Sequence, residues 1–358
     1  MDRLSNTLFS VLKTALWKET LNMDVFISFT VDDWQQFYKL SAQQGVLAII
    51  YDVVSRLPER CQPPRNIKLR WGLGVENIEK RYKIQLAGAN KLCDIWDASG
   101  IRTVVLKGFS LSKYYPVPEH RECGDFDCYL LEGRYEDGNV LAEQNGAKVN
   151  REWYKHSQIY FRGMMAENHN FLVTTREGKS AKELNTILVD KLGGNLQPIE
   201  NTKIFLPSPI FTALFVTYHS FSPFISEGIT IRHLCDWACF MKAEQNNFDW
   251  NYFYELCKQF KFDRFVDASN EIITKFLNVE LPNKSIICNS PYTQQVLDDI
   301  LYGNSKVFNS NKGKWYKRIK LITNIFSYRW KHHDIARSSS LNYFLSIIFG
   351  FLFRKEKH

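Results

Sequence analysis

The sequence predicts an α+β protein in which a small mixed sheet with its helices lies between two helical regions. Apolar residues follow helical spacing over residues 1–100, and short β-branched and aromatic runs between glycines and prolines replace that spacing over residues 101–178. Helical spacing returns over residues 179–303. We expect these three units to be followed by a basic, amphipathic tail at residues 304–358.

The N-terminal region is predicted to be helical throughout. One apolar run begins after Thr30, which is a favoured N-cap residue, and continues to Leu57. A second run starts at Ile67 and ends at Gly100, where glycine favours the end of a helix. We interpret this region as a helical module that packs on the rest of the chain.

The central region is predicted to alternate between strands and helices before it ends in a meander. Residues 101–108 indicate a strand, and residues 109–116 can form about two helical turns before a proline. Residues 125–131 alternate like a second strand, and residues 134–146 suit a helix closed by glycine. Three further strand-like runs follow, at residues 147–153, 157–163 and 165–173.

The C-terminal region is again predicted to be helical, because several runs have apolar residues at helical spacing and begin with capping residues. These runs are residues 179–192, 208–221, 228–245, 248–260 and 262–277.

The positive charge of the chain is concentrated in its tail. The whole chain has a net charge of +8, while residues 312–358 contain eleven Lys/Arg and two Asp/Glu. The other residues therefore nearly balance, so we expect no specific nucleic-acid partner. The tail also has thirteen uncharged residues from Leu341 to Phe353, fewer than the roughly 20 that span a bilayer. A peripheral membrane contact through residues 312–358 and packing on the body or on a partner are both open.

The cysteines and the N-terminus indicate a reducing compartment. The eight cysteines are scattered without a CxxC pair, which argues against a zinc ribbon or finger. The first 21 residues lack a basic start followed by an apolar run, so we expect no signal peptide. We predict a cytoplasmic location, with the inner membrane surface as the alternative site for a membrane-bound tail.

A pair of aspartates lies inside the predicted strand at residues 125–131. Side chains two apart on a strand point to the same face, so Asp125 and Asp127 should lie side by side. Two neighbouring carboxylates repel unless a cation lies between them, and Mg²⁺ prefers such oxygen ligands. The alternative is a solvated pair at an exposed strand end.

The sequence before the pair suits an anion-binding turn. Gly108 would let the backbone approach a ligand closely, and Ser110 is a candidate cap and phosphate ligand. Lys107 or Arg121 could balance phosphate charge. A third carboxylate, Glu167, follows on a later strand, and three carboxylates beside such a turn are the parts needed for two-metal phosphoryl transfer.

Several other polar residues have both a structural and a functional interpretation. His169 shares a face with Glu167 and could support it or act as a base, although a strand histidine is more often simply hydrogen-bonded. Arg232 and Asp236 are spaced as a helical ion pair. The remaining candidates, with the same two interpretations, are His156, His219, Cys235 and Cys239.

This arrangement resembles the polymerase-beta-like nucleotidyltransferase superfamily, which has a Gly-Ser turn, a DxD strand and a third carboxylate. More narrowly, "VVLKGFSLSKYYPVPEHRECGDFDCYLL" is similar to an uncharacterised bacterial nucleotidyltransferase family with the motif LKG, YP, R and GDxDxLV. "KHSQIYF", "ENHNFL" and "GITIRHLCDWACFM" resemble its later segments, so the similarity covers about residues 40–275. Phe109 separates Gly108 from Ser110, and Cys128 and Tyr129 replace apolar residues of the motif.

The resemblance implies an enzyme that moves a nucleoside monophosphate from an NTP to a hydroxyl of a protein, sugar or small molecule and releases pyrophosphate. Asp125, Asp127 and Glu167 would hold two Mg²⁺ ions and form the catalytic centre. The nucleotide would bind Lys107, Gly108, Ser110 and Arg121. The alternative is a binding or assembly protein on the same fold with a vestigial site, associated with a membrane or a partner through its C-terminal tail.

Overall fold

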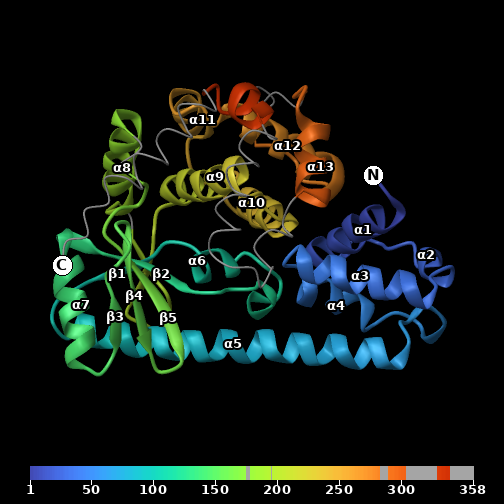
Figure 1. Ribbon diagram of the computed structural model, residues 1–358, viewed down its shortest axis with the longest axis horizontal. Helices are drawn as coiled ribbons and strands as arrows, with labels where there is room; N and C mark the ends of the chain where they lie inside the picture. Colours follow the sequence, from blue (N-terminus) through green and yellow to red (C-terminus); the bar gives the residue numbers. More distant parts are fainter. Residues whose placement is uncertain (175–177, 195, 283–288, 304–328, 339–358) are drawn as a thin grey trace.

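The structure is a computed structural model that describes residues 1–174, 178–194, 196–282, 289–303 and 329–338. It confirms the predicted α+β class, with one mixed sheet between helical N- and C-terminal regions (Figure 1). Apart from residues 329–338, the tail and the membrane contact predicted for it lie outside the described residues. The division into four units stays a prediction.

The sheet has seven strands in the order β3-β4-β5-β2-β1-β7-β6. β2 is antiparallel to β1 and parallel to β5, and β7 is parallel to β1. Five strands match the predicted runs, whereas β6 and β7 were not predicted. Their bounds are Thr103–Val105 (β1), Phe126–Leu130 (β2), Lys148–Asn150 (β3), His156–Phe161 (β4), Met164–His169 (β5), Gln197–Pro198 (β6) and Ile204–Leu206 (β7).

Helix α3 begins where its capping residue indicates, whereas α5 ends at Asp97, before the predicted Gly100. The backbone N–H of Asp33 donates to the Thr30 hydroxyl, and the Asp33 carboxylate accepts from the Thr30 N–H. Gly45, at a φ of +66°, separates α3 from α4 within the run that starts at Thr30. The helices are Arg3–Trp17 (α1), Asp24–Ile27 (α2), Val31–Gln43 (α3), Leu47–Val54 (α4) and Arg65–Asp97 (α5), with a 3₁₀ turn at Glu59–Cys61 (η1).

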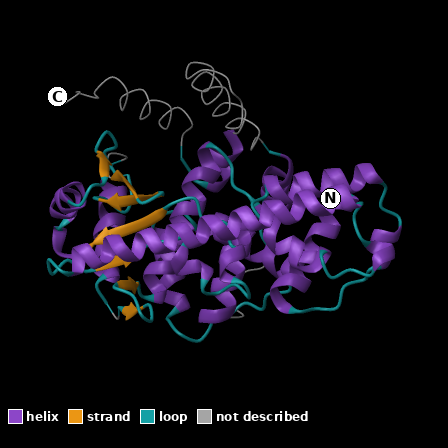
Figure 2. Ribbon diagram, turned by 90° about the horizontal axis from the view of Figure 1, so that it is seen from below, coloured by secondary structure: helices purple, strands orange, loops and turns teal. Residues whose placement is uncertain are grey.

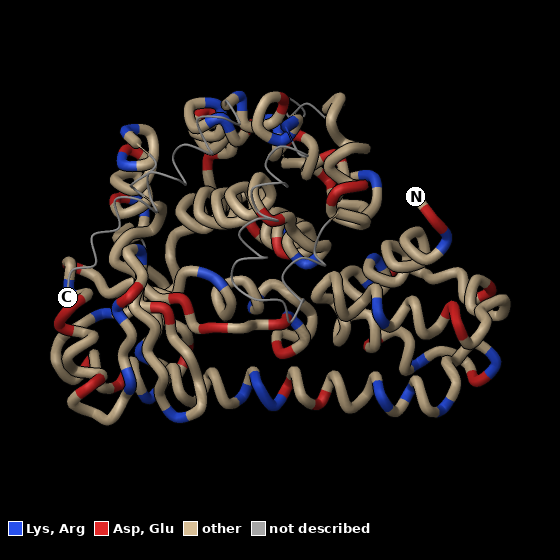
Figure 3. Tube along the Cα trace, in the orientation of Figure 1, with Lys and Arg blue, Asp and Glu red and all other residues tan. Residues whose placement is uncertain are grey.

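Helix α5, 33 residues long, runs under both the N-terminal helices and the sheet (Figure 1). Near one end, the Trp71 indole donates to the Leu47 carbonyl of α4. Near the other end, the Trp96 indole donates to the Gly138 carbonyl of α7 (Tyr135–Gln144). Acidic and basic residues are interspersed along α5, which shows no continuous basic strip (Figure 3).

The sheet packs one face on α5 and turns the other towards the C-terminal helices. Phe126, Cys128 and Leu130 of β2 are buried in the core formed with α5 and α7. By strand alternation Asp127 therefore lies on the opposite face. There His169, at the end of β5, contacts the Phe215 ring of α9.

The C-terminal helices form the second layer, and the sheet stands at one end of an elongated, mostly helical molecule (Figure 2). Among the described residues, none of the helices combines the length and apolarity needed to cross a bilayer. The helices are Lys179–Leu192 (α8), Pro209–Ser226 (α9), Ile231–Glu244 (α10), Trp250–Gln259 (α11), Asp263–Leu277 (α12) and Thr293–Tyr302 (α13), with a π-helical turn at Lys331–Ile335 (η5).

The segment between β1 and β2 is more irregular than predicted. Helix α6 is a single turn, Phe109–Ser112, instead of about two turns. A 3₁₀ turn at Pro118–His120 (η2) follows, and another at Leu131–Gly133 (η3) lies after β2. His120 of η2 contacts Asp52 and Glu79 at 2.8 and 3.0 Å, which fixes this connection to α4 and α5.

Candidate active site

The three predicted carboxylates meet on the sheet face that points away from α5. Asp127 of β2 is paired in register with Glu167 of the parallel strand β5, so both side chains lie on the same face. Asp125 precedes β2 and is two residues from Asp127. One carboxylate oxygen from each residue lies within 4.8 Å of the others. The strand alternation inferred from the sequence therefore brings the three groups together.

Lys107 follows β1 and reaches this cluster from the neighbouring strand. Its Nζ lies 3.1 Å from Asp127 Oδ1 and 4.0 Å from Asp125 Oδ2. Burial alone would lower the pKa of Lys107, but Asp127, Asp125 and Glu167 outweigh burial and raise it. Lys107 is therefore charged and partly neutralises the cluster.

The pKa values of the two aspartates are shifted in opposite directions. Asp127 is 0% exposed, and burial alone would raise its pKa, but Lys107 and His169 outweigh burial and hold the pKa well below its usual range. For Asp125, burial and then the Asp127 charge raise the pKa to about 6, against the opposing effect of Lys107. Asp127 Oδ2 is buried and has no hydrogen-bond partner among the described residues. The cluster thus has carboxylate oxygens and negative charge that these residues leave uncompensated.

Two histidines stand beside Glu167. His156 of β4 and His169 of β5 are paired across the antiparallel β4–β5 hairpin. His156 Nε2 lies 3.4 Å from Glu167 Oε1, and His169 Nε2 lies 3.1 Å from Asp127 Oδ1. Burial lowers the pKa of His156, only partly opposed by Glu167, so this imidazole is neutral at pH 7. The sequence indicated His169 beside Glu167 but did not indicate the pairing of the two histidines.

A cavity of about 330 Å³ opens beside the carboxylates, within the size range of small-molecule pockets. Lys107, Gly108 and Asp125 form one wall, and α9 and α10 provide the other. Gly108 has a φ of +67°, and a Cβ there would lie 3.5 Å from the Asp125 carbonyl oxygen. That contact is an ordinary one, so the positive φ is what favours glycine at this turn, and close approach to a ligand stays a prediction.

Two arginines on the cavity wall differ in how they are held. The guanidinium of Arg121 is buried and donates twice to Asp236, both at 2.8 Å. Tyr115 donates a third hydrogen bond to Asp236. By contrast, the Arg232 side chain is 26% exposed, and its one ion pair among the described residues is a 3.7 Å contact with Asp236. Arg121 is thus tied to the protein, while Arg232 has donors available to the cavity.

A family model described as an uncharacterised nucleotidyltransferase matches residues 30–278. The chain belongs to this nucleotidyltransferase family. No curated protein and no solved structure matches the chain. The match confirms the resemblance seen in the sequence and supports nucleotidyl transfer as the general activity.

The residues that the family model matches include all the predicted site residues. In the structure, some of these residues line the cavity and others do not. Lys107 and Gly108 line the cavity. Ser110, in α6, is buried, with 2% of it exposed, and it is not among the described residues that line the cavity. Its hydroxyl has no hydrogen-bond partner among the described residues. The buried cysteines 235 and 239 are unpaired, as expected for core residues.

Lys155 was not recognised from the sequence. Its Nζ lies 3.4 Å from Nε2 of His219, a residue of α9 on the cavity wall. Burial, then Lys155 and Lys107, lower the pKa of His219 well below its usual range, so the imidazole is neutral and can accept from the ammonium. Lys155 immediately precedes β4 and its contact is with α9. No local sequence pattern could therefore have predicted its position here.

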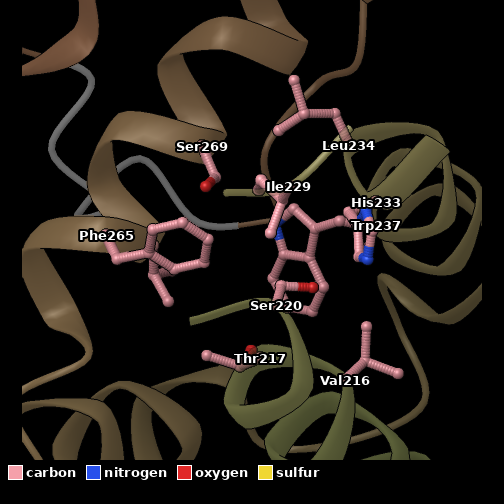
Figure 4. A pocket seen from close by; sticks show the side chains of 10 residues that line it. Val216, Thr217, Ser220, Ile229, His233, Leu234, Trp237, Phe265 and Ser269 are labelled. Atoms are coloured by element: carbon pink, nitrogen blue, oxygen red, sulfur yellow. The ribbon is translucent and has the colours of Figure 1, made fainter. Parts of the chain in front are cut away.

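A smaller cavity of about 20 Å³ lies between α9, α10 and α12 (Figure 4). His233 lines both this cavity and the larger one. It is the third residue of α10, and its Nδ1 accepts the backbone N–H of Thr230 at 3.2 Å. A neutral histidine thus takes the place that Glu or Gln takes in an ordinary capping box.

We predict that His233→Gln makes the protein less sensitive to acid. Burial, and then the charge of Arg232, lower the pKa of His233 from 6.5 to about 3. Below pH 6.5 the unfolded chain therefore binds a proton at this histidine, whereas the folded protein does not until about pH 3. Stability falls from pH 6.5 towards pH 3. In denaturant unfolding at pH 7 and pH 4, the variant should lose about 3 kcal/mol less stability between these pH values than the wild type. Equal losses in both proteins would show that His233 takes up its proton without opening the cap.

Proposed function

We propose that the protein transfers a nucleoside monophosphate from an NTP to a hydroxyl acceptor and releases pyrophosphate, with divalent cations held by Asp125, Asp127 and Glu167. The observation that carries this proposal is the convergence of three carboxylates within 4.8 Å, with Asp127 Oδ2 buried and unpartnered among the described residues. The cluster borders a cavity with cationic groups on its wall. Membership of the nucleotidyltransferase family supports the same class of reaction.

The donor set fits Mg²⁺, which prefers carboxylate oxygens together with phosphate oxygens and water. Bound there, the ions would neutralise phosphate charge and lower the pKa of the acceptor hydroxyl. Asp125, on the cavity wall and 28% exposed, is placed to face the nucleotide. Glu167, on the neighbouring strand, is assigned to the acceptor side.

The residues on the wall supply the nucleotide site. Lys107 can shift part of its interaction from Asp127 to a phosphate, since its side chain is 27% exposed. Gly108 allows the chain to approach a phosphate closely. Arg121 contributes indirectly by holding Asp236, and Ser110 stays a predicted ligand. The acceptor (a protein, sugar or small molecule) and a membrane contact through residues 312–358 also stay predictions.

We predict that Arg232→Ala weakens NTP binding about tenfold while leaving the fold intact. The guanidinium has donors free for phosphate, and a charge-assisted hydrogen bond contributes about 1.5–3 kcal/mol. Isothermal titration with a non-hydrolysable NTP analogue and Mg²⁺ gives the affinity.

Arg121→Ala is the matched control for Arg232→Ala. It should lower the free energy of unfolding by about 3–5 kcal/mol, because it leaves Asp236 charged and buried without its main partner. If Arg232→Ala destabilised the protein as much and bound nucleotide normally, Arg232 would be a structural residue.

The function is tested by incubating the protein with each α-labelled NTP, Mg²⁺ and a cell lysate, and following pyrophosphate release and labelled products. Mg²⁺-dependent label transfer that is absent in Asp125→Asn supports the proposal. The vestigial alternative has one observation in its favour, which is that Lys107 already neutralises Asp127 without a metal. Nucleotide binding that is absent, or independent of Mg²⁺, would favour that alternative.

A further inference from the structure

We infer that the cluster has a second ion position with nitrogen ligands, formed by His156, His169 and Glu167, and that it takes a first-row transition-metal dication in preference to Mg²⁺. One ligand atom from each of these residues lies within 4.8 Å of the others. This position shares Glu167 with the carboxylate position formed with Asp125 and Asp127. The inference therefore rests on, and deepens, the proposed function.

The distances between the ligand atoms suit a shared ion. Two atoms that each lie about 2.1 Å from one ion are about 3.0 Å apart at right angles and about 3.4 Å apart at the tetrahedral angle. His156 Nε2 is 3.4 Å from Glu167 Oε1, and His169 Nε2 is 3.7 Å from Glu167 Oε2. His169 Nε2 is also 3.1 Å from Asp127 Oδ1, which can complete the set. The ligand atoms of His156, His169 and Glu167 lie within 4.8 Å of one another, so binding one ion would draw them closer together.

The hydrogen bonding of His169 independently points to a ligand. Its Nδ1 faces the Phe171 carbonyl oxygen at 3.3 Å and its Nε2 faces Asp127 Oδ1 at 3.1 Å. Both oxygens can only accept, so the single proton of a neutral ring can serve only one of these two contacts. With the proton on Nδ1, Nε2 presents a lone pair to the carboxylates of Asp127 and Glu167. Lone pairs facing one another repel unless a cation lies between them. A ligating histidine whose other N–H donates to a backbone carbonyl has this same arrangement.

Two further atoms at the cluster lack partners. His156 Nδ1 and Asp127 Oδ2 are buried, and neither has a hydrogen-bond partner among the described residues. Asp127 is completely buried, so its free oxygen cannot be satisfied at the surface. A cation beside Asp127 and Glu167 would satisfy the Asp127 oxygen, and the two carboxylates would offset the charge of a dication.

The nature of the ligands determines which ion is preferred. Imidazole nitrogen binds Mn²⁺, Fe²⁺, Co²⁺ or Zn²⁺ readily, whereas Mg²⁺ selects oxygen and keeps several waters. Two histidines with one carboxylate therefore favour a transition metal over Mg²⁺. Asp125 is not one of these ligands. The other ion position, formed by Asp125, Asp127 and Glu167, therefore has oxygen ligands only.

The alternative state of the same contacts is a His169 that carries a proton on Nε2 and donates it to Asp127. In that state its Nε2 has no lone pair and cannot bind a metal. The two states differ in whether metal binding depends on the histidines, and this difference can be measured without nucleotide and without turnover.

The experiment uses the full-length protein after removal of metals. Co²⁺ is titrated at pH 7.5 and followed by its visible absorption, and bound Mn²⁺ is examined by pulsed electron paramagnetic resonance for coupling to ¹⁴N. We expect ¹⁴N coupling in the wild type and at least tenfold weaker Co²⁺ binding in His156→Gln and in His169→Gln. His219→Gln, a nearby histidine outside the ligand set, should bind Co²⁺ as the wild type does. Asp125→Asn should also keep the Co²⁺ site.

The wild-type ¹⁴N measurement needs no variant, so it decides the question even if a histidine variant misfolds. Absence of ¹⁴N coupling, or Co²⁺ affinity unchanged in both histidine variants, overturns the inference. Failure of the proposed function appears differently, as a protein that binds Co²⁺ through histidine and transfers no label with any NTP. If Mg²⁺ supports transfer but no metal binds through nitrogen, the proposed function holds and only this inference is wrong.

Discussion

Replacing Asp125 by asparagine should abolish Mg²⁺-dependent nucleotidyl transfer while the protein stays folded. Asp125 lies on the cavity wall beside the carboxylates of Asp127 and Glu167, and removal of its charge takes away one oxygen ligand of the oxygen-only ion position. We expect the transfer rate to fall by about 10³-fold or more, on the scale of losing a principal electrostatic contribution to the transition state. Single-turnover transfer at saturating NTP measures the loss.

The same variant should be at least as stable as the wild type when no metal is present. The Asp125 pKa is raised from 3.8 to about 6, so the folded protein binds a proton more readily than the unfolded chain, and stability falls as pH rises from 3.8 to 6. Asparagine removes this cost, so at pH 7 the free energy of unfolding should rise by about 1–2 kcal/mol. Asp127→Asn is the contrasting control, because it takes the main ion-pair partner from Lys107 and should destabilise the protein. A melting temperature that fell in Asp125→Asn with transfer retained would make Asp125 a structural residue.

Glu167→Gln should lower the transfer rate by about 10²-fold or more and change NTP affinity by only a few fold. Glu167 lies on β5, one strand farther from the Lys107 side of the cluster than Asp127, and it is assigned to the acceptor-side ion. Loss of that carboxylate removes assistance to the attacking hydroxyl, which is comparable to losing a general base.

Binding and chemistry have to be measured on one preparation of the Glu167→Gln protein, by titration of a non-hydrolysable NTP and by single-turnover transfer. Gln158 is paired with Glu167 across the hairpin. The control combines Glu167→Gln with Gln158→Glu, so that the carboxylate is moved to the neighbouring strand. Collapse of NTP affinity with a normal rate at saturation would place Glu167 in the nucleotide pocket instead. No change in either quantity would remove it from the site.

Strand alternation was enough to predict that the carboxylates of the candidate site lie together. The spacing of Asp125 and Asp127 places both on one face, and the apolar residues Phe126 and Cys128 between and after them fix which face is buried on α5. The pairing of His156 with His169 could also have been inferred, because a two-residue turn at Arg162 and Gly163 sets the hairpin register.

Contacts between distant segments could not be predicted from local patterns. β6 and β7 are two and three residues long, and β7 joins the sheet only through its parallel pairing with β1. Arg121 suited a phosphate ligand by its position in the sequence, yet it binds Asp236, 115 residues away. Lys155 reaches the site through a contact with His219, 64 residues away. These pairings depend on how the layers pack, and the sequence around each residue does not encode it.

The length of α5 fixes the rotation of one half of the protein relative to the other. Its indole contacts at Trp71 and Trp96 hold α4 and α7 to the same helix, 25 positions apart. One residue inserted between them would turn α7 and the sheet by about 100° and shift them by about 1.5 Å relative to the N-terminal helices. Seven residues, about two turns, would restore the orientation to within about 20°. A single residue inserted in α5 should therefore displace the N-terminal helices relative to the sheet.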